Sequence, residues 1–261
     1  ERPAGQQCVA GADAQYLSRR ADPCLCYDGA MSLLLVPGYM ADDTLWDDMR
    51  DRLAPFGPLV HADLRHDSTL EDMARRTLAS APPSFILVGF SMGGYVAREI
   101  VRQAPERVRA LVLIATSARP DSDTVRQRKR TVARAAPSVS FAGLSRTAIA
   151  SSLHPREASN EALIERVRMM GVRLGGEAFR NQSMVERPGD LHLLGEIRCP
   201  TLVVAAGHDR LRSLEEAQEL HAGIAGAQFA LVEDSGHMIP LEAPQALCDV
   251  IVPWLAQLRD S

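Results

Sequence analysis

The 261-residue chain is predicted to be an α/β protein built on a doubly wound, mostly parallel β-sheet. First, short apolar runs rich in β-branched residues alternate with longer amphipathic stretches. Second, these runs are apolar throughout, which is typical of strands that helices cover on both faces. Third, the connections between runs and stretches are short, which implies right-handed crossovers between parallel strands.

Six apolar runs are predicted to be strands, namely residues 32–38, 58–65, 84–90, 107–116, 200–207 and 227–234. Amphipathic stretches follow most of them and are predicted to be helices, namely residues 42–57, 68–81, 91–105, 213–226 and 243–258. Ser68 is expected to cap the second helix, because Glu71 and Asp72 fall in its first turn. The last helix is expected to pack back on the sheet.

Residues 119–194 interrupt this alternation, since they have helical patterns but no strand. We therefore divide the chain into a core, residues 1–118 and 195–261, and an insertion between two late strands. Ligands of doubly wound sheets bind at the carboxyl ends of the strands, so the insertion is predicted to be a helical lid. The alternative is a peripheral helical decoration.

One segment of this insertion, residues 124–136, has several basic residues and no acidic residue. This pattern indicates either a solvated helix face or a docking site for an anionic substrate or an acidic carrier protein.

The composition excludes several classes of partner. The net charge is only −4, so no global attraction to nucleic acid or to an anionic membrane is expected. No apolar stretch approaches the roughly 20 residues that a membrane helix needs. The chain starts without Met and without an apolar signal core, which predicts a cytoplasmic protein and leaves a processed or exported form open.

The five cysteines predict neither a disulfide framework nor a metal site, because their number is odd and the C-L-C spacing differs from C-x-x-C. Cys199 and Cys248 stand in apolar contexts and are predicted to be core residues. A single disulfide bond between two of the residues Cys8, Cys24 and Cys26 remains an alternative.

Ser91 lies between Gly89 and Gly93 in the pattern G-x-S-x-G, which is weak evidence when it stands alone. Here the pattern lies where a predicted strand ends and a predicted helix begins, as a nucleophile on a sharp turn requires. Glycines two residues to either side would avoid β-carbon clashes, and the helix amino terminus would favour a developing oxyanion. The alternative is an ordinary helix-capping serine.

A serine nucleophile needs a base and an acid that orients the base. His237 follows the last strand and is expected at the same edge of the sheet as Ser91, although a purely structural histidine is the alternative. Asp209, at the end of the preceding strand, is the predicted acid. Asp121, after the fourth strand, is the alternative acid, whereas Asp234 is poorly placed because it lies only three residues before His237.

The order serine, acid, histidine resembles the α/β-hydrolase superfamily. The resemblance covers residues 32–258 and includes five ordered segments: VPGYMADDTLW, GFSMGGYVA, PERVRALVLIATSA, CPTLVVAAGHD and DSGHMIPLEAPQAL. It implies that the backbone N–H groups of Tyr39 and Met92 form an oxyanion hole, even though Pro37 replaces the histidine that many relatives have. The absence of a D-x-x-G-x-G-x-S loop argues against the epoxide-hydrolase, dehalogenase and C–C hydrolase branches. Residues 8–31 offer only weak strands, so the sheet is expected to be truncated at that edge.

We therefore predict a serine hydrolase that acts on a small or medium ester or lactone without a metal or cofactor. Thioesterase, carrier-protein methyl esterase and amide or C–C hydrolase activities remain alternatives on the same three residues, because fold does not decide among them. A ligand-binding receptor that keeps these residues is a further alternative. An apolar pocket or lid core is expected from Phe141, Met169, Met170, Phe179 and Met184.

Overall fold

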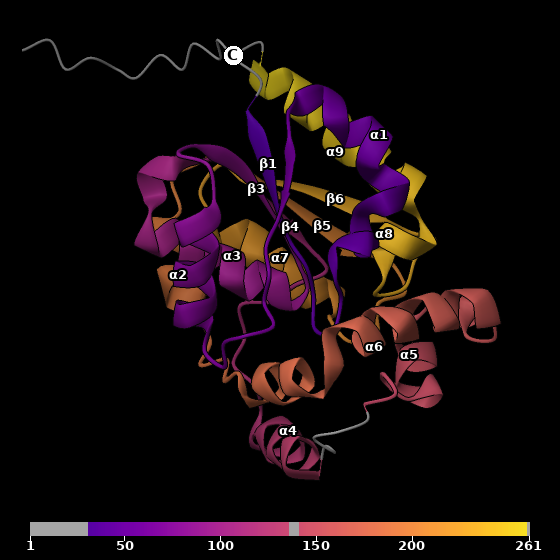
Figure 1. Ribbon diagram of the computed structural model, residues 1–261. Coiled ribbons are helices and arrows are strands. Elements are labelled where there is room, and N and C mark those ends of the chain that lie inside the picture. The colour runs from indigo at the N-terminus through magenta and orange to yellow at the C-terminus, as the bar shows by residue number, and fades with distance from the viewer. Residues whose placement is uncertain (1–30, 136–140, 260–261) are drawn as a thin grey trace, which may run out of the picture.

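The computed structural model describes residues 31–135 and 141–259, and their centre is a six-stranded parallel sheet (Figure 1). The strand order is β2-β1-β3-β4-β5-β6. The strands are β1 (Ser32–Val36), β2 (Leu59–His61), β3 (Phe85–Phe90), β4 (Val108–Ile114), β5 (Thr201–Ala206) and β6 (Gln228–Val232). Every pair of neighbouring strands is parallel, so the predicted class and sheet type are confirmed.

Each face of the sheet has its own helical layer and its own apolar core, because side chains alternate along a strand. In β1, Leu34 packs with helices on one face and Leu35 with helices on the other. The first layer is α2 (Leu70–Ser80), α3 (Met92–Gln103) and α7 (Leu214–Gly223), and the second is α1 (Arg50–Leu53), α8 (Ile239–Glu242) and α9 (Pro244–Arg259) (Figure 1). β1, β3, β4 and β5 are buried as predicted, whereas the edge strands β2 and β6 are largely half-exposed.

Two local predictions are wrong in detail. The expected helix over residues 42–57 is mostly 3-10 helix, in the segments η1 (Asp43–Met49) and η2 (Ala54–Phe56), with only α1 between them. Thr69, and not Ser68, caps α2, because Thr69 is the last extended residue and its Oγ1 accepts a hydrogen bond from Asp72 N at 3.1 Å.

The described residues between β4 and β5 form helices and no strand. These helices are α4 (Asp123–Ala135), α5 (Arg146–Ser152) and α6 (Glu161–Met184), with the 3-10 segments η4 (Pro155–Glu157) and η5 (Leu191–Glu196). Figure 1 shows α4, α5 and α6 together beyond the ends at which the strands finish. α6 bends at Gly175, because the φ of this residue is +84° and therefore not helical.

A buried ion pair joins the chain after α6 to the core. Arg98 on α3 is fully buried and donates from Nε and Nη2 to the two carboxylate oxygens of Asp190, both at 2.8 Å. Its Nη2 also donates to Ser117 O at 2.8 Å. Because both charges are hydrogen-bonded, this pair fixes the return of the inserted helices to the sheet.

Several other expectations concern the surface and the cysteines. Cys248 is fully buried, as predicted, whereas Cys199 is only partly buried at the margin of the core. The predictions for residues 8–31, with Cys8, Cys24 and Cys26, concern residues outside the described part of the chain.

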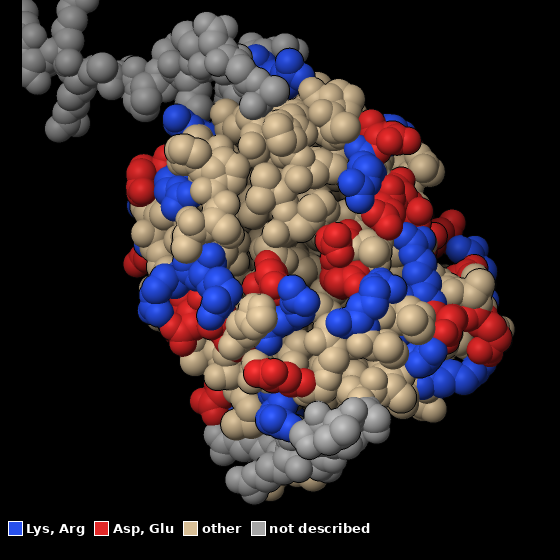
Figure 2. All heavy atoms as spheres, in the orientation of Figure 1, with Lys and Arg blue, Asp and Glu red and all other residues tan. Residues whose placement is uncertain are grey.

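Basic and acidic side chains are interspersed over the face of the molecule in Figure 2. In the described part of the chain, no helix has the length and apolarity to cross a membrane.

Candidate active site

Ser91 occupies a strained turn between β3 and α3. Its φ is +52° and its ψ is −113°, a region that residues other than glycine rarely adopt. Ser91 N donates to Ile114 O at 2.9 Å, and Thr116 Oγ1 donates to Ser91 O at 2.7 Å. Contacts with the end of β4 therefore hold the turn in this conformation.

The glycines that flank Ser91 are required by close packing of backbone. A β-carbon at Gly93 would lie 2.2 Å from Val36 O, and one at Gly89 would lie 2.7 Å from Gly93 O. Gly94 allows a close approach of the same kind, because a β-carbon there would lie 2.4 Å from Thr116 Oγ1. The turn is thus compatible with glycine alone at these positions.

The structure brings Ser91, His237 and Asp209 into one hydrogen-bonded chain. Nε2 of His237 lies 2.8 Å from Ser91 Oγ, and its Nδ1 lies 2.7 Å from Asp209 Oδ2. All three side chains are buried, with 5% of the His237 side chain and 1% of the Asp209 side chain exposed. A carboxylate only accepts hydrogen bonds, so Nδ1 carries the proton and Nε2 presents its lone pair to the serine hydroxyl.

Asp209 is itself held by backbone donors. Its Oδ1 accepts from Leu211 N at 2.7 Å and from Arg212 N at 2.9 Å, which leaves Oδ2 for the histidine. The two other carboxylates weighed from the sequence have different contacts. Asp121 pairs with Lys129, and Asp234 is exposed and lies 3.4 Å from Arg156.

Glu242 at the end of α8 anchors the loop that carries His237. Its carboxylate accepts from the backbone N–H groups on both sides of the histidine, Gly236 N at 3.2 Å and Met238 N at 2.9 Å, and from His154 N at 2.6 Å. Burial raises the pKa of Glu242 even though these three donors lower it. Sequence analysis missed this residue, because an acidic residue in the turn before a helix carries no signal of its own.

We expect Glu242→Gln to loosen the His237 loop. The oxygen of the glutamine amide can still accept a hydrogen bond, but its nitrogen is a donor and would face a backbone N–H group. We expect the free energy of unfolding to fall by about 1–3 kcal/mol. Denaturant unfolding and kcat measure the effect, and kcat is expected to fall by roughly tenfold, the equivalent of ~1.4 kcal/mol. Glu165→Gln, which removes an exposed ion pair with Arg168, is the matched control and should change the stability by less than about 1 kcal/mol. Equal effects of the two substitutions would contradict the anchoring role.

The loop after β1 lies beside Ser91 and is tied to the end of α6. A β-carbon at Gly38 would be 3.3 Å from Ser91 Cβ, so the loop approaches the serine at the residue before Tyr39. Met40 N donates to Gln182 Oε1 at 2.8 Å, and Tyr39 Oη lies 2.6 Å from Ser183 Oγ. Burial raises the pKa of Tyr39 to about 12. Met92 is the first residue of α3, where backbone N–H groups have no partner within the helix.

Gln182 and Ser183 were not singled out from the sequence, because α6 is separated from the β1 loop by more than 100 residues. Gln182 is 1% exposed, and its Nε2 donates to Leu64 O at 3.2 Å. Together with the contact to Met40, this side chain joins α6 to two loops of the core.

The apolar residues expected around the site divide into two groups. Phe179 lies 6.1 Å from Tyr39 between ring centroids, and Phe141 lies 4.6 Å from Phe179. Met170 is fully buried in the core, whereas Met184 is 44% exposed. Met169 is half-buried. Of these residues, Phe179 therefore adjoins Tyr39 of the β1 loop.

A family model described as "Alpha/beta hydrolase family" matches residues 17–250 of the chain. Curated proteins also match over part of the chain. The pimeloyl-[acyl-carrier protein] methyl ester esterase of Klebsiella pneumoniae (strain 342) is 36% identical over 98 residues, which are 34% of this chain and 38% of that protein. The match to these curated relatives thus spans well under half of their length.

Solved structures match over most of the chain. A thermophilic esterase from Thermogutta terrifontis has a TM-score of 0.79 and 28% sequence identity, with 88% of this chain and 90% of that chain covered. The enol-lactonase from Burkholderia xenovorans LB400 has a TM-score of 0.76 and 19% identity, with 87% and 92% covered, and at that identity the likeness concerns the fold.

Proposed function

Because the chain belongs to the alpha/beta hydrolase family, we propose that it is a serine hydrolase that cleaves a carboxylic ester or lactone. The observation that carries the proposal is the chain of short contacts from Ser91 Oγ through His237 to Asp209 Oδ2. The strained backbone of Ser91 supports it, since strain at a nucleophile is retained only where the surrounding structure imposes it. The likeness to an esterase at 28% identity agrees with ester chemistry.

In the first half of the reaction, Ser91 Oγ attacks the ester carbonyl while its proton passes to His237 Nε2. The backbone N–H groups of Tyr39 and Met92 receive the oxyanion of the tetrahedral intermediate. Asp209 holds the imidazole by Nδ1 and stabilises its positive charge. The intermediate collapses when the bond to the alkoxy oxygen breaks and the alcohol takes the proton from Nε2.

In the second half, water attacks the acyl-enzyme and gives its proton to His237 Nε2. The new tetrahedral intermediate releases the carboxylic acid, and the proton returns to Ser91 Oγ. This cycle uses no group outside the chain other than water.

We further propose that the inserted helices, residues 119–194, act as a lid over this site. Support comes from the position of α4, α5 and α6 at the carboxyl ends of the strands and from the contacts of Gln182 and Ser183 with the β1 loop. A lid that holds the oxyanion loop would couple the arrangement of α6 to the position of Tyr39 N.

A second candidate is hydrolysis of a methyl ester on an acyl group that a carrier protein bears. The names of the relatives that are 36% identical over a third of the chain favour it. The basic character of residues 124–136 also agrees with an acidic partner. Kinetics with one methyl ester, borne either by a carrier protein or by a small thiol, separate the two candidate functions. Only an esterase that recognises the carrier protein is expected to have a lower KM for the carrier-borne ester.

A fluorophosphonate probe and a substrate panel test the proposal. We expect the folded protein to be labelled at Ser91 and to hydrolyse aryl esters, alkyl esters and lactones with higher kcat/KM than amides of the same acyl group. Labelling together with faster turnover of amides than of esters would favour an amide substrate, and labelling without turnover of the panel would favour a thioester. Folded protein that is neither labelled nor active would overturn the proposal and favour a ligand-binding receptor.

A further inference from the structure

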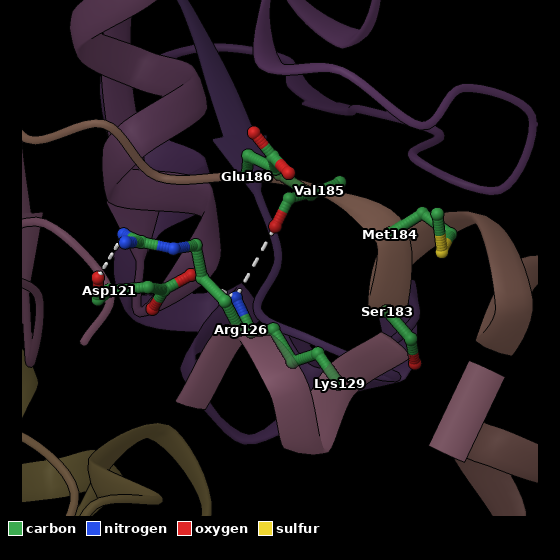
Figure 3. Close-up of a pocket in the computed structure, with 7 residues that line it drawn as sticks. All are labelled: Asp121, Arg126, Lys129, Ser183, Met184, Val185 and Glu186. Atoms are coloured by element: carbon green, nitrogen blue, oxygen red, sulfur yellow. Dashed lines mark hydrogen bonds and ion pairs between the residues drawn. The ribbon is translucent and has the colours of Figure 1, made fainter. Parts of the chain in front are cut away.

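Two basic side chains outside the reaction centre converge on one carboxylate. Lys129 on α4 donates from Nζ to Asp121 Oδ2 and, at 3.3 Å, to Val185 O (Figure 3). On the other side, Arg187 Nη1 lies 3.7 Å from Asp121 Oδ1. Asp121 thus stands between an ammonium and a guanidinium group, and both Asp121 and Arg187 are buried.

One donor of the buried Arg187 guanidinium has no hydrogen-bond partner among the described residues. Its Nε has no acceptor among the described residues, and the 3.7 Å to Asp121 exceeds hydrogen-bond distance. Its other contact is with the face of Tyr95, 5.0 Å from the ring centroid. Arg187 is 7% exposed, so this orphan donor is costly unless an acceptor completes the site.

Arg187 also lies close enough to two other cations, Lys129 and Arg212, to interact with both electrostatically. Arg212 lies over the same Tyr95 ring and is paired with Glu216 at 3.4 Å, which leaves Arg187 and Lys129 to share Asp121. Burial and the neighbouring charge of Arg187 lower the pKa of Lys129 to about 8. A second anion beside these two cations would therefore be stabilised.

A hollow beside Lys129 extends to the end of α6, and Arg126 and Glu186 also line it. Asp121, Lys129 and Ser183 are among the residues that line it (Figure 3). Ser183 Oγ contacts Tyr39 Oη at 2.6 Å, and Tyr39 follows the glycine that packs against Ser91. Through Ser183, the hollow thus adjoins a side chain of the loop that packs against Ser91.

We propose that Lys129 and Arg187 bind the free carboxylate of an acidic substrate whose ester group lies at Ser91. This inference rests on the proposed function and names a substrate class, the monoesters of dicarboxylic acids. A planar carboxylate matches the fork of a guanidinium group and can also accept from an ammonium. The distal carboxylate would enter past Tyr39.

The kinetic experiment compares monomethyl esters of dicarboxylic acids, from succinate to suberate, with neutral methyl esters of equal length. We expect at least one monoester to exceed its neutral partner in kcat/KM by tenfold or more. Lys129→Gln should lower that ratio about tenfold, and Lys129→Arg should restore most of it. Arg168→Gln, which removes an exposed lid cation, is the control and should leave the ratio unchanged. The inference would be overturned if the wild-type protein had equal kcat/KM for the monoester and the neutral ester at every chain length. It would also be overturned if Lys129→Gln left the preference for the monoester intact. Either result leaves the esterase proposal standing.

A binding experiment separates this inference from the hydrolytic proposal. Calorimetry with the Ser91→Ala protein compares the binding of monomethyl adipate with that of dimethyl adipate. We expect the monoester to bind more tightly, and we expect the additional substitution Lys129→Gln to abolish this difference. That result would support the subsite even without turnover. Arg187→Gln should have the same effect wherever its thermal unfolding shows a folded protein. Equal affinities for the two esters would contradict the subsite, and stronger competition by inorganic phosphate than by adipate would overturn the choice of a carboxylate.

Discussion

Ser91→Ala is expected to lower kcat/KM for an aryl ester by at least about 10⁴-fold, and towards 10⁶-fold, while the fold is retained. The substitution removes the Oγ that lies 2.8 Å from His237 Nε2 and leaves the N–H groups of Tyr39 and Met92 in place. Residual catalysis from these groups explains why the expected loss is finite. Steady-state kinetics with freshly purified protein measures the effect.

Ser91→Gly separates the chemical role of this residue from its conformational cost. Glycine adopts a φ of +52° without strain, so this variant should be more stable than Ser91→Ala by about 1 kcal/mol and equally inactive. Ser151→Ala, at an exposed serine of α5, is the matched control and should keep full activity. More than a hundredth of the wild-type rate in Ser91→Ala would contradict a nucleophilic role for this serine.

The sheet could be predicted because its signal is local. An apolar run that is buried on both faces needs few long-range contacts to be recognised, and all six strands lie within the predicted segments. Burial of the edge strands could not be predicted, since which strand lies at the edge depends on strand order. The cap of α2 differed by one residue because Ser68 and Thr69 have nearly the same capping chemistry.

In the site, Ser91, Asp209 and His237 could be predicted from motif context and position, and the structure places these three side chains in contact. The residues that hold them could not be predicted. Glu242 acts through backbone N–H groups, and Gln182 reaches Met40 from a distant helix, so neither role leaves a periodicity or spacing in the sequence. Arg187 likewise follows α6 in an ordinary polar stretch, and only its burial distinguishes it.

Asp209→Asn is expected to lower kcat by roughly 10⁴-fold with little change in KM, through the tautomer of His237. In the wild-type protein, Oδ1 accepts two backbone N–H groups and Oδ2 faces His237 Nδ1. The asparagine oxygen will keep the position of Oδ1, because the two backbone donors there need an acceptor. Its amide nitrogen must then face Nδ1 and donate to it.

This reversal forces the proton of the imidazole onto Nε2, so that His237 presents a donor to Ser91 Oγ in place of a lone pair and no longer acts as a base. Asp234→Asn is the matched control, because Asp234 is closer to His237 in sequence but exposed, and it should retain full activity. Kinetics and an NMR measurement of the histidine ring protons together test the explanation. An active Asp209→Asn enzyme, or an inactive one whose Nδ1 still carries the proton, would refute it, because the carboxylate is needed here to keep that proton on Nδ1.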